Sequence, residues 1–452
     1  MERELTTRQL IGDALGQFSL NAVTMLMSLL MFFYTEVVGV SAGLIGTILL
    51  LTKVIDSAAD IGMGYIVDRT RSKHGQARPW LLWMTIPMFV LTVLVFIVPN
   101  ISDGGKIAYI VITNLLFYIC VITPTSIPYA SLMALTTRSN EDRSIMGLFR
   151  AVASFVSGGV VTIAFIPVVN MLGGGQKEWI FLASVIALIS SVGIFIAYKS
   201  TREKYNTEQL KEEGEIKKTL SLLTGAKLLF SNKYWLVTFL VGFFTNISFG
   251  MASSSGMYYA KYIWGNVNLV GILGAITLLL NLFVFAISVP IIKRWGQRNT
   301  AVVGLIVGIV GSVVRIIDPH SITIGVIGSA LQSFAMIPLM VVMMPLITST
   351  IEYGEWKHGQ RIVGLTNSIN SLGNKVGTAL GTALIGWLLA WGHFQEGAAV
   401  QTESANSIII VMGIYVPLVL YIIMAVLLCF YSLEKQYTRI LDDLSKRRSP
   451  IE

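Results

Sequence analysis

Residues 180–198 read IFLASVIALISSVGIFIAY, a run that contains no charged side chain. A helix rises about 1.5 Å per residue, so a run of this length crosses most of the ~30 Å apolar core of a bilayer. Comparable apolar runs recur along the whole chain. They predict an all-α membrane protein with twelve transmembrane helices, at residues 11–35, 43–67, 79–99, 107–134, 145–168, 178–198, 233–261, 267–292, 299–317, 322–347, 362–391 and 406–431.

Composition and the placement of charge agree with this interpretation. Hydrophobic residues make up 54% of the chain and charged residues 13%, whereas soluble domains carry about 25% charged residues. The net charge of +8 does not indicate nucleic-acid binding, because Lys and Arg gather in the short gaps after even-numbered spans and near both termini. Cytoplasmic loops carry this excess of positive charge. We therefore expect both termini in the cytoplasm, the lipid bilayer as the surroundings and no nucleic-acid partner.

The longest polar stretch lies midway along the chain and is rich in Lys and Glu. It predicts an N-terminal six-helix bundle at 1–198, a cytoplasmic central loop at 199–232, and a C-terminal six-helix bundle with a short cytoplasmic tail at 233–452. Transporters built from two related halves have this layout. A short internal echo is consistent with it, since RSIMGL at 143–148 and RIVGL at 361–365 open the fifth span of each half.

The second span carries three ionisable side chains. Asp56 and Asp60 are four residues apart and hence on one face of the helix, and Lys53 lies about one turn earlier. An ionisable residue deep in a membrane costs roughly 2.5–3.5 kcal/mol on insertion scales, which makes each a functional candidate. Two carboxylates this close in an apolar setting need a positive partner. A bound Na⁺ or a proton would make a cation site, whereas a static ion pair with Lys53 is the alternative.

Two basic residues lie within later spans. Lys375, in the eleventh span, is roughly 21 Å from the preceding loop at 1.5 Å per residue, and its ammonium group needs an anion. Asp56 and Asp60 are the deep candidates for that role. Arg150, in the fifth span, is nearer its loop, and extension of its side chain to the surface explains it equally well. Three further charged residues occur at span ends, where we expect them to be solvated: Glu36, Arg315 and Asp318.

Several motifs resemble those of one transporter family. The stretch DSAADIGMGYIVDRTRSKHGQARPW at 56–80 is similar to the signature of the glycoside–pentoside–hexuronide:cation symporters, which include the melibiose permeases and glucuronide carriers. Shorter matches are FYTEVVG at 33–39, IPY at 127–129 and EYGEWK at 352–357. The matches extend over nearly the whole chain. The resemblance implies the major facilitator fold, with two six-helix bundles.

The resemblance also assigns roles to individual residues. It implies a cation site at Asp56, Asp60 and Thr123, and places Arg150 and Lys375 near the sugar. It further implies a cytoplasmic gating motif that contains Asp68, Arg69 and Arg71.

Three positions depart from the melibiose permeases. Ser126 and Asn21 stand where those proteins carry sugar-binding aspartates, and Ala130 replaces a stacking tryptophan. Neutral side chains cannot form the charge-assisted hydrogen bonds by which a carboxylate holds sugar hydroxyls. We therefore expect Asn21 and Ser126 to line a site that is not specific for galactosides. Retention of Arg150 and Lys375 would suit a hexuronide, and neutral glucosides or xylosides are the alternative.

The combined prediction is a secondary active transporter of the bacterial inner membrane. It imports a small sugar glycoside by symport with H⁺ or Na⁺ through alternating access, and it has no cofactor and no metal other than Na⁺ at Asp56 and Asp60. Because Ala59 replaces a polar Na⁺ ligand of the family, H⁺ is favoured over Na⁺. The alternatives are an intramembrane Mg²⁺-dependent transferase, suggested by the Asp-x-x-x-Asp spacing, and a sugar receptor that does not transport.

Overall fold

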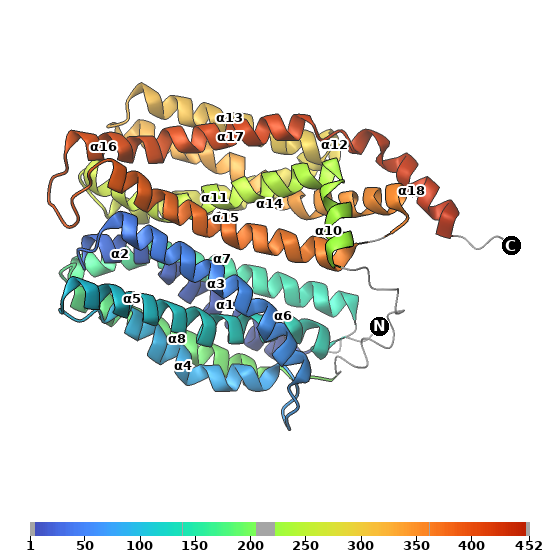
Figure 1. Cartoon of the computed structure of the whole chain (residues 1–452), viewed down its shortest axis with the longest axis horizontal. Helices are drawn as coiled ribbons and strands as arrows, with labels where there is room; N and C mark the ends of the chain where they lie inside the picture. Colours follow the sequence, from blue (N-terminus) through green and yellow to red (C-terminus); the bar gives the residue numbers. More distant parts are fainter. Residues whose placement is uncertain (1–4, 138, 205–221, 361, 449–452) are drawn as a thin grey trace. The chain divides into compact units, whose positions relative to one another are not determined.

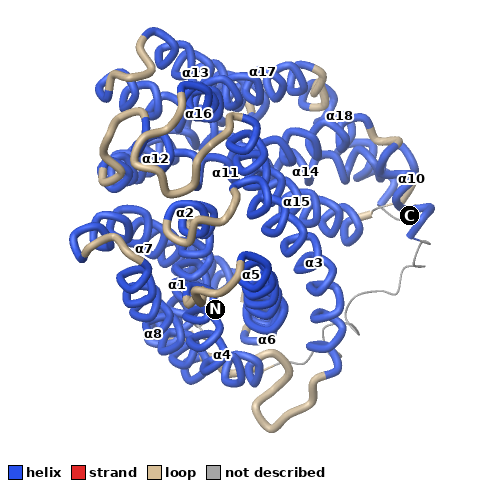
Figure 2. The backbone as a smooth tube through the Cα atoms, turned by 60° about the vertical axis from the view of Figure 1, so that its left-hand side comes forward, coloured by secondary structure: helices blue, strands red, loops and turns tan. Residues whose placement is uncertain are grey.

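The computed structural model describes residues 5–137, 139–204, 222–360 and 362–448. Figure 2 shows helices joined by loops, and no strand occurs within these ranges. The predicted all-α class is therefore confirmed.

The chain forms two compact units, whose helices are coloured from blue to green and from green to red in Figure 1. Unit 1 is Met1–Lys217 with the short segments Val267–Gly274 and Gln395–Val400, and unit 2 is the remainder. Of the predicted central loop at 199–232, residues 205–221 lie outside the described ranges. The end of the predicted loop forms a short helix, α10, at Leu222–Phe230.

The helices of unit 1 are α1 (Thr7–Ser28), α2 (Leu30–Glu36), α3 (Ala42–Arg69), α4 (Arg78–Phe96), α5 (Asp103–Phe117), the π-helical turn η1 (Tyr118–Ile122), α6 (Thr123–Thr136), α7 (Asn140–Leu172) and α8 (Gln176–Ser200). After α10, the chain continues through α11 (Lys233–Tyr262), α12 (Leu269–Trp295), α13 (Gln297–Ile317), α14 (Ile322–His358), α15 (Val363–Trp391), α16 (Glu403–Ile410), the π-helical turn η2 (Val411–Tyr415), α17 (Val416–Cys429) and α18 (Glu434–Arg448).

Among the described residues, eleven helical segments are long and apolar enough to cross a membrane. The remaining predicted span, 362–391, corresponds to α15, a helix of 29 residues that does not belong to those eleven. Its first half is rich in Asn, Ser, Thr and Gly and contains Lys375. Its length suits a span, but its polar face needs water or protein rather than lipid.

Small residues allow close helix packing in both units. In unit 2, a Cβ atom added at Gly377 or Gly381 of α15 would lie 2.8 Å or 2.2 Å from a backbone oxygen of α11. In unit 1, a Cβ at Gly193 of α8 would lie 2.2 Å from Ser19 Oγ of α1. Such close contacts are typical of membrane helices, where van der Waals packing drives association.

In both units, a glutamate carboxylate caps the start of a long helix. The carboxylate of Glu203, just after α8, accepts hydrogen bonds from three backbone N–H groups at the start of α4, including that of Arg78 at 2.6 Å. The carboxylate of Glu434, just after α17, accepts one at 2.8 Å from the N–H of Arg298 at the start of α13. The Nε atoms of Arg78 and Arg298 donate in turn to backbone carbonyls at the ends of α8 and α17, each at 2.8 Å. This correspondence agrees with two related halves.

Candidate functional site

The predicted cation residues lie together in unit 1. Asp56 and Asp60 are on α3, and Thr123 is the first residue of α6. The Thr123 hydroxyl lies 2.7 Å from Oδ1 of Asp56 and 2.9 Å from Oδ1 of Asp60. Asp56 and Thr123 are buried, whereas Asp60 is half-buried. The two carboxylates and the hydroxyl thus form one cluster at the crossing of α3 and α6.

The backbone just before Thr123 is irregular. The turn η1 is a π-helix, and the N–H of Thr123 bonds to the carbonyl of Tyr118, five residues earlier. Such π-bulges are frequent at functional sites because they redirect the side chains that follow. Here the bulge lies immediately before the hydroxyl that contacts both carboxylates.

The Thr123 hydroxyl cannot fully satisfy both carboxylates. It carries one proton and two acceptor lone pairs, so it can donate a full hydrogen bond to only one carboxylate oxygen at a time. A proton on the other carboxyl group could be donated to the lone pairs of Thr123. One added proton would therefore let the Thr123 hydroxyl bond to both carboxyl groups.

Lys53 lies near the same cluster. Its Nζ atom is 3.7 Å from the centroid of the Tyr118 ring, in cation–π geometry. This contact holds the ammonium group against η1, the bulge that precedes Thr123.

Arg150 forms a buried ion pair that the sequence analysis missed. Its Nε and one terminal nitrogen donate to the Asp13 carboxylate at 2.6 Å and 2.8 Å. The guanidinium carbon lies 3.9 Å from the centroid of the Tyr129 ring, and Tyr129 Oη donates to the backbone carbonyl of Asp13 at 2.7 Å. Asp13 is 1% exposed and Arg150 is 8% exposed. Arg150 does not extend to the surface, and Asp13 is another buried carboxylate besides Asp56. The composition of the first span gave one signal, since Asp13 is an acidic residue near the start of an otherwise apolar run.

The two neutral residues predicted to line the sugar site are both in unit 1. Asn21 Nδ2 donates to the Ser154 carbonyl at 2.8 Å and to Ser157 Oγ at 2.9 Å, which joins α1 to α7. Ser126 is half-buried on α6, one turn after Thr123. The predicted gating residues Asp68, Arg69 and Arg71 are exposed at and just beyond the end of α3.

In unit 2, Lys375 is half-buried on α15. The residue before it, Asn374, accepts a hydrogen bond at 3.0 Å from Asn246 of α11. Asn246 and Asn374 were not predicted from the sequence, because an asparagine inside an apolar run carries no charge to mark it.

The prediction that Arg315 is solvated is wrong. The sequence placed it at a span end in solvent, but it is 6% exposed. One terminal nitrogen donates to Gln332 Oε1 at 3.0 Å and to the Gly413 carbonyl at 2.8 Å, and the guanidinium carbon lies 4.7 Å from the Tyr259 ring centroid. Gly413 lies in η2, so Arg315 fixes this π-helical turn against α13. Asp318, by contrast, is exposed as expected.

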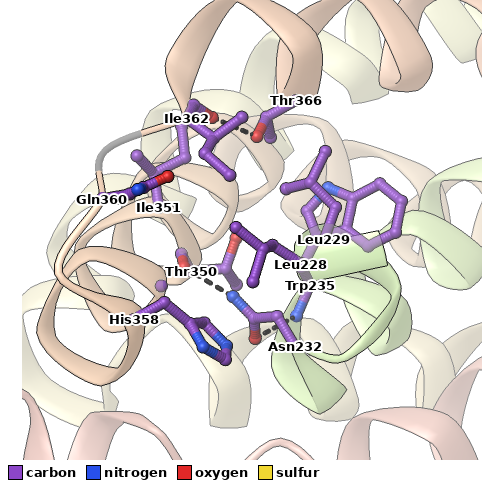
Figure 3. A pocket seen from close by; sticks show the side chains of 11 residues that line it. Leu228, Leu229, Asn232, Trp235, Thr350, Ile351, His358, Gln360, Ile362 and Thr366 are labelled. Atoms are coloured by element: carbon purple, nitrogen blue, oxygen red, sulfur yellow. Dashed lines mark hydrogen bonds between the residues drawn. The ribbon is translucent and has the colours of Figure 1, made fainter. Parts of the chain in front are cut away.

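A small pocket in unit 2 does not include any of the predicted site residues. Figure 3 shows its lining side chains, which come from α10, α14 and the starts of α11 and α15. Asn232 caps α11 and donates from Nδ2 to the Thr350 carbonyl at 2.8 Å. Leu228, Leu229 and Trp235 line the pocket beside the α10–α11 junction, so we assign this pocket to the packing of α10 against the longer helices.

Known proteins share this architecture. A homologue of the lysosomal transporter Spinster from bacteria, solved in an inward-facing and unoccupied conformation, superposes with a TM-score of 0.68 at 13% identity, covering 96% of this chain and 97% of the other. This likeness establishes the fold.

Sequence relatives extend over the whole chain. The isoprimeverose transporter of Lactiplantibacillus pentosus is 28% identical, with 96% of this chain and 91% of the relative covered. The glucuronide carrier protein homolog of Escherichia coli is 29% identical, with 99% and 97% covered. A family model described as MFS/sugar transport protein matches residues 12–435. The chain therefore belongs to the MFS/sugar transport protein family.

Proposed function

We propose that this transporter imports a small neutral glycoside together with a proton. The observation that carries the proposal is the position of the Thr123 hydroxyl, within hydrogen-bond distance of both Asp56 and Asp60. A carrier that couples sugar to a cation needs a site whose charge changes when the cation binds. This cluster is suited to such a change, because one added proton would let the Thr123 hydroxyl bond to both carboxyl groups.

Relatives support the class of activity. They include proteins named as an isoprimeverose transporter, a putative glycoside/cation symporter and a glucuronide carrier protein homolog. Relatives of this kind are transporters rather than enzymes, which argues against the intramembrane transferase. A receptor that binds sugar without moving it would gain nothing from a cation cluster inside the membrane.

The proton is favoured over Na⁺ by the ligand set. Two carboxyl groups and one hydroxyl surround the point where a proton would sit, and the residue just before Asp60 is Ala59, which offers no side-chain oxygen. A sodium ion needs several oxygen ligands, whereas a proton needs a single carboxylate. Co-transport then proceeds by alternating access, with the proton bound at Asp56 and Asp60 as the sugar enters.

The ion pair of Arg150 bears on the substrate. The charge of Arg150 is balanced by Asp13 within unit 1, so it does not offer an uncompensated positive charge to a substrate carboxylate. This balance favours a neutral glycoside over a hexuronide.

Uptake into proteoliposomes tests the proposal. We expect one member of a panel of glucosides, xylosides, galactosides and glucuronides to accumulate when a proton gradient is imposed, inside alkaline. A sodium gradient of equal size should drive little accumulation. Accumulation that needs Na⁺ would contradict the proton assignment, and binding without transport would indicate a receptor.

We also propose that the chain lies in the bacterial inner membrane with both termini in the cytoplasm, since basic residues cluster in alternate loops and near both ends. An epitope tag at each terminus tests the orientation. Protease added to intact cells should leave both tags uncut. It should cleave both tags once the membrane is permeabilised and the protease reaches the cytoplasmic face.

A further inference from the structure

One face of α15 combines polarity with exposure. Ser371 and Asn374 are exposed, and Lys375 and Thr378 are half-buried. Polar groups within a membrane span almost always face a bundle interior or a water-filled cavity, because contact with lipid is costly. This part of α15 is therefore suited to meet a polar solute.

Asn246 of α11 holds this face in one arrangement. Its Nδ2 donates to the Gly242 carbonyl at 2.9 Å and to Asn374 Oδ1 at 3.0 Å. Its Oδ1 lies 3.3 Å from the Thr378 hydroxyl. Since a backbone carbonyl can only accept, the bond to Gly242 identifies which end of the Asn246 amide is the nitrogen. Both hydrogens of the Asn246 amide are thereby engaged. The Thr378 hydroxyl has one proton, which it can donate either to the Asn246 oxygen or to the Asn374 backbone carbonyl, 3.0 Å from that hydroxyl.

The orientation of Asn246 determines that of Asn374. The Asn374 oxygen accepts from Asn246, so the Asn374 NH₂ group points away from α11. No described residue accepts a hydrogen bond from this NH₂ group, and the side chain is exposed. Asn374 thus directs its two hydrogen-bond donors away from α11 on the exposed face of α15, while its oxygen is directed toward Asn246.

In unit 1, an asparagine of the first span also bonds to the fifth span, but the contact uses different polar groups. Asn21 of α1 donates with its NH₂ group to Ser154 and Ser157 of α7. Ser157 and Asn374 occupy corresponding places in the internal echo, because each is ten residues after the glycine of its segment (Gly147 or Gly364). In each unit, the first span (α1 or α11) therefore fixes a polar position on the fifth span (α7 or α15). In unit 1 this contact does not use the Asn21 side-chain oxygen, which is an acceptor. In unit 2 it does not use the Asn374 NH₂ group, which is a donor.

We propose that Asn246 is a positioning residue of the substrate site, which orients the Asn374 amide so that it donates hydrogen bonds to an acceptor oxygen of the glycoside. This inference rests on the proposed glycoside transport and deepens it. The group on the sugar that Asn374 would recognise is an oxygen that accepts hydrogen bonds. It could be a ring oxygen, a glycosidic oxygen or a hydroxyl group that uses its lone pairs.

Substitution Asn246→Asp provides the sharpest test, because it keeps the shape of the side chain and removes its donors. Asn374 would turn its NH₂ group toward the new carboxylate and its oxygen outward, which inverts the hydrogen-bond polarity. We expect the affinity for the best-bound 4-nitrophenyl glycoside of a gluco, xylo, galacto and glucurono panel to fall on the order of tenfold, the effect of one lost hydrogen bond. Asn246→Ala, which frees Asn374 to rotate, should have a smaller effect.

Sugar analogues separate positioning from simple support of the fold. A deoxyfluoro sugar keeps a weak acceptor but no donor, whereas a deoxy sugar has neither. At one ring position, the unsubstituted protein should bind the deoxyfluoro analogue better than the deoxy analogue, and Asn246→Asp should lose this preference. Asn374→Asp, whose carboxylate still accepts from Asn246 but cannot donate, should behave in the same way and serves if Asn246→Asp fails to fold.

Asn367→Asp is the matched control, since it adds the same charge to an exposed position of α15. It should leave affinity and analogue preference unchanged. Suppose that Asn246→Asp, Asn246→Ala and Asn367→Asp lose equal affinity for the glycoside and keep the preference for the deoxyfluoro analogue. This result would overturn the positioning role of Asn246 but not the proposed function. Failure of the unsubstituted protein to bind any glycoside of the panel would overturn the proposed function, and this inference with it.

Discussion

The acidic side chains within the spans of unit 1 have two kinds of partner. Asp13 pairs with Arg150, whereas Asp56 and Asp60 share the single hydroxyl of Thr123. The first arrangement is electrically balanced by two fixed charges. In the second, two carboxyl groups lie against one hydroxyl that has a single proton, and an added proton would let Thr123 bond to both of them, which makes it the better candidate for coupling.

Removal of one partner from the buried pair should destabilise unit 1. Asp13→Asn leaves the Arg150 charge buried without its counter-charge, a change that typically costs about 3–5 kcal/mol. We expect thermal unfolding in detergent, followed by tryptophan fluorescence, to occur at a clearly lower temperature. The double variant Asp13→Asn with Arg150→Gln should recover much of the loss, because no charge then remains. Equal stability of Asp13→Asn and the unsubstituted protein would show that the pair contributes little.

From the sequence, Asp56 and Asp60 could be grouped and Arg150 singled out, but Asp13 could not be identified as the partner of Arg150. Asp56 and Asp60 are recognised by their spacing on one helix, a local pattern. Asp13 and Arg150 are 137 residues apart, and nothing in either segment indicates the other. Arg315 was misjudged for the same reason, since the carbonyl that holds it belongs to Gly413, in a π-helical turn that the sequence does not reveal.

At the scale of helices, close packing of α11 and α15 supports the polar face of α15. The glycines of α15 let the backbones of α11 and α15 approach closely. Asn246 and Asn374 form their hydrogen bond beside this close approach. The glycines at 373 and 377 are the small residues that such close packing needs. The sequence could not indicate which polar side chains meet across the contact, because that depends on the rotation of both helices.

A methyl group at this contact should disrupt it. In Gly381→Ala the new Cβ atom would lie 2.2 Å from the Ile247 carbonyl oxygen, so the backbones must separate. Overpacking of this kind typically costs about 1–3 kcal/mol. We expect a lower melting temperature and weaker glycoside binding, measured on the purified protein.

Gly256→Ala on α11 is the control for that change, since a Cβ atom there meets nothing within 4 Å. It should be neutral or slightly stabilising, because alanine is favoured over glycine in a helix by about 1 kcal/mol. A melting temperature of Gly381→Ala at or above that of Gly256→Ala would contradict the packing account.

At the scale of the whole molecule, related devices recur in the two units. Glu203 and Glu434 cap equivalent helices, and Asn21 and Asn246 fix equivalent contacts. The periodic apolar runs and the alternation of charged loops were sufficient to predict the all-α class and nearly all spans. The span at α15 is polar for a membrane helix, and its deviation from the apolar pattern coincides with the face that we propose meets the substrate.

The central claim is that a cation at Asp56 and Asp60 couples energy to sugar transport, and Asp56→Asn tests it most directly. Asparagine keeps the size of the side chain but cannot be protonated or deprotonated, so the coupling charge is lost. Proteoliposomes should be loaded with the transported glycoside to measure exchange, and separately given an inside-alkaline proton gradient to measure accumulation. Asp103→Asn, an exposed aspartate at the start of α5, is the control. The account predicts that Asp56→Asn abolishes accumulation while exchange persists, and that Asp103→Asn changes neither. Accumulation by Asp56→Asn equal to that of the unsubstituted protein would contradict it.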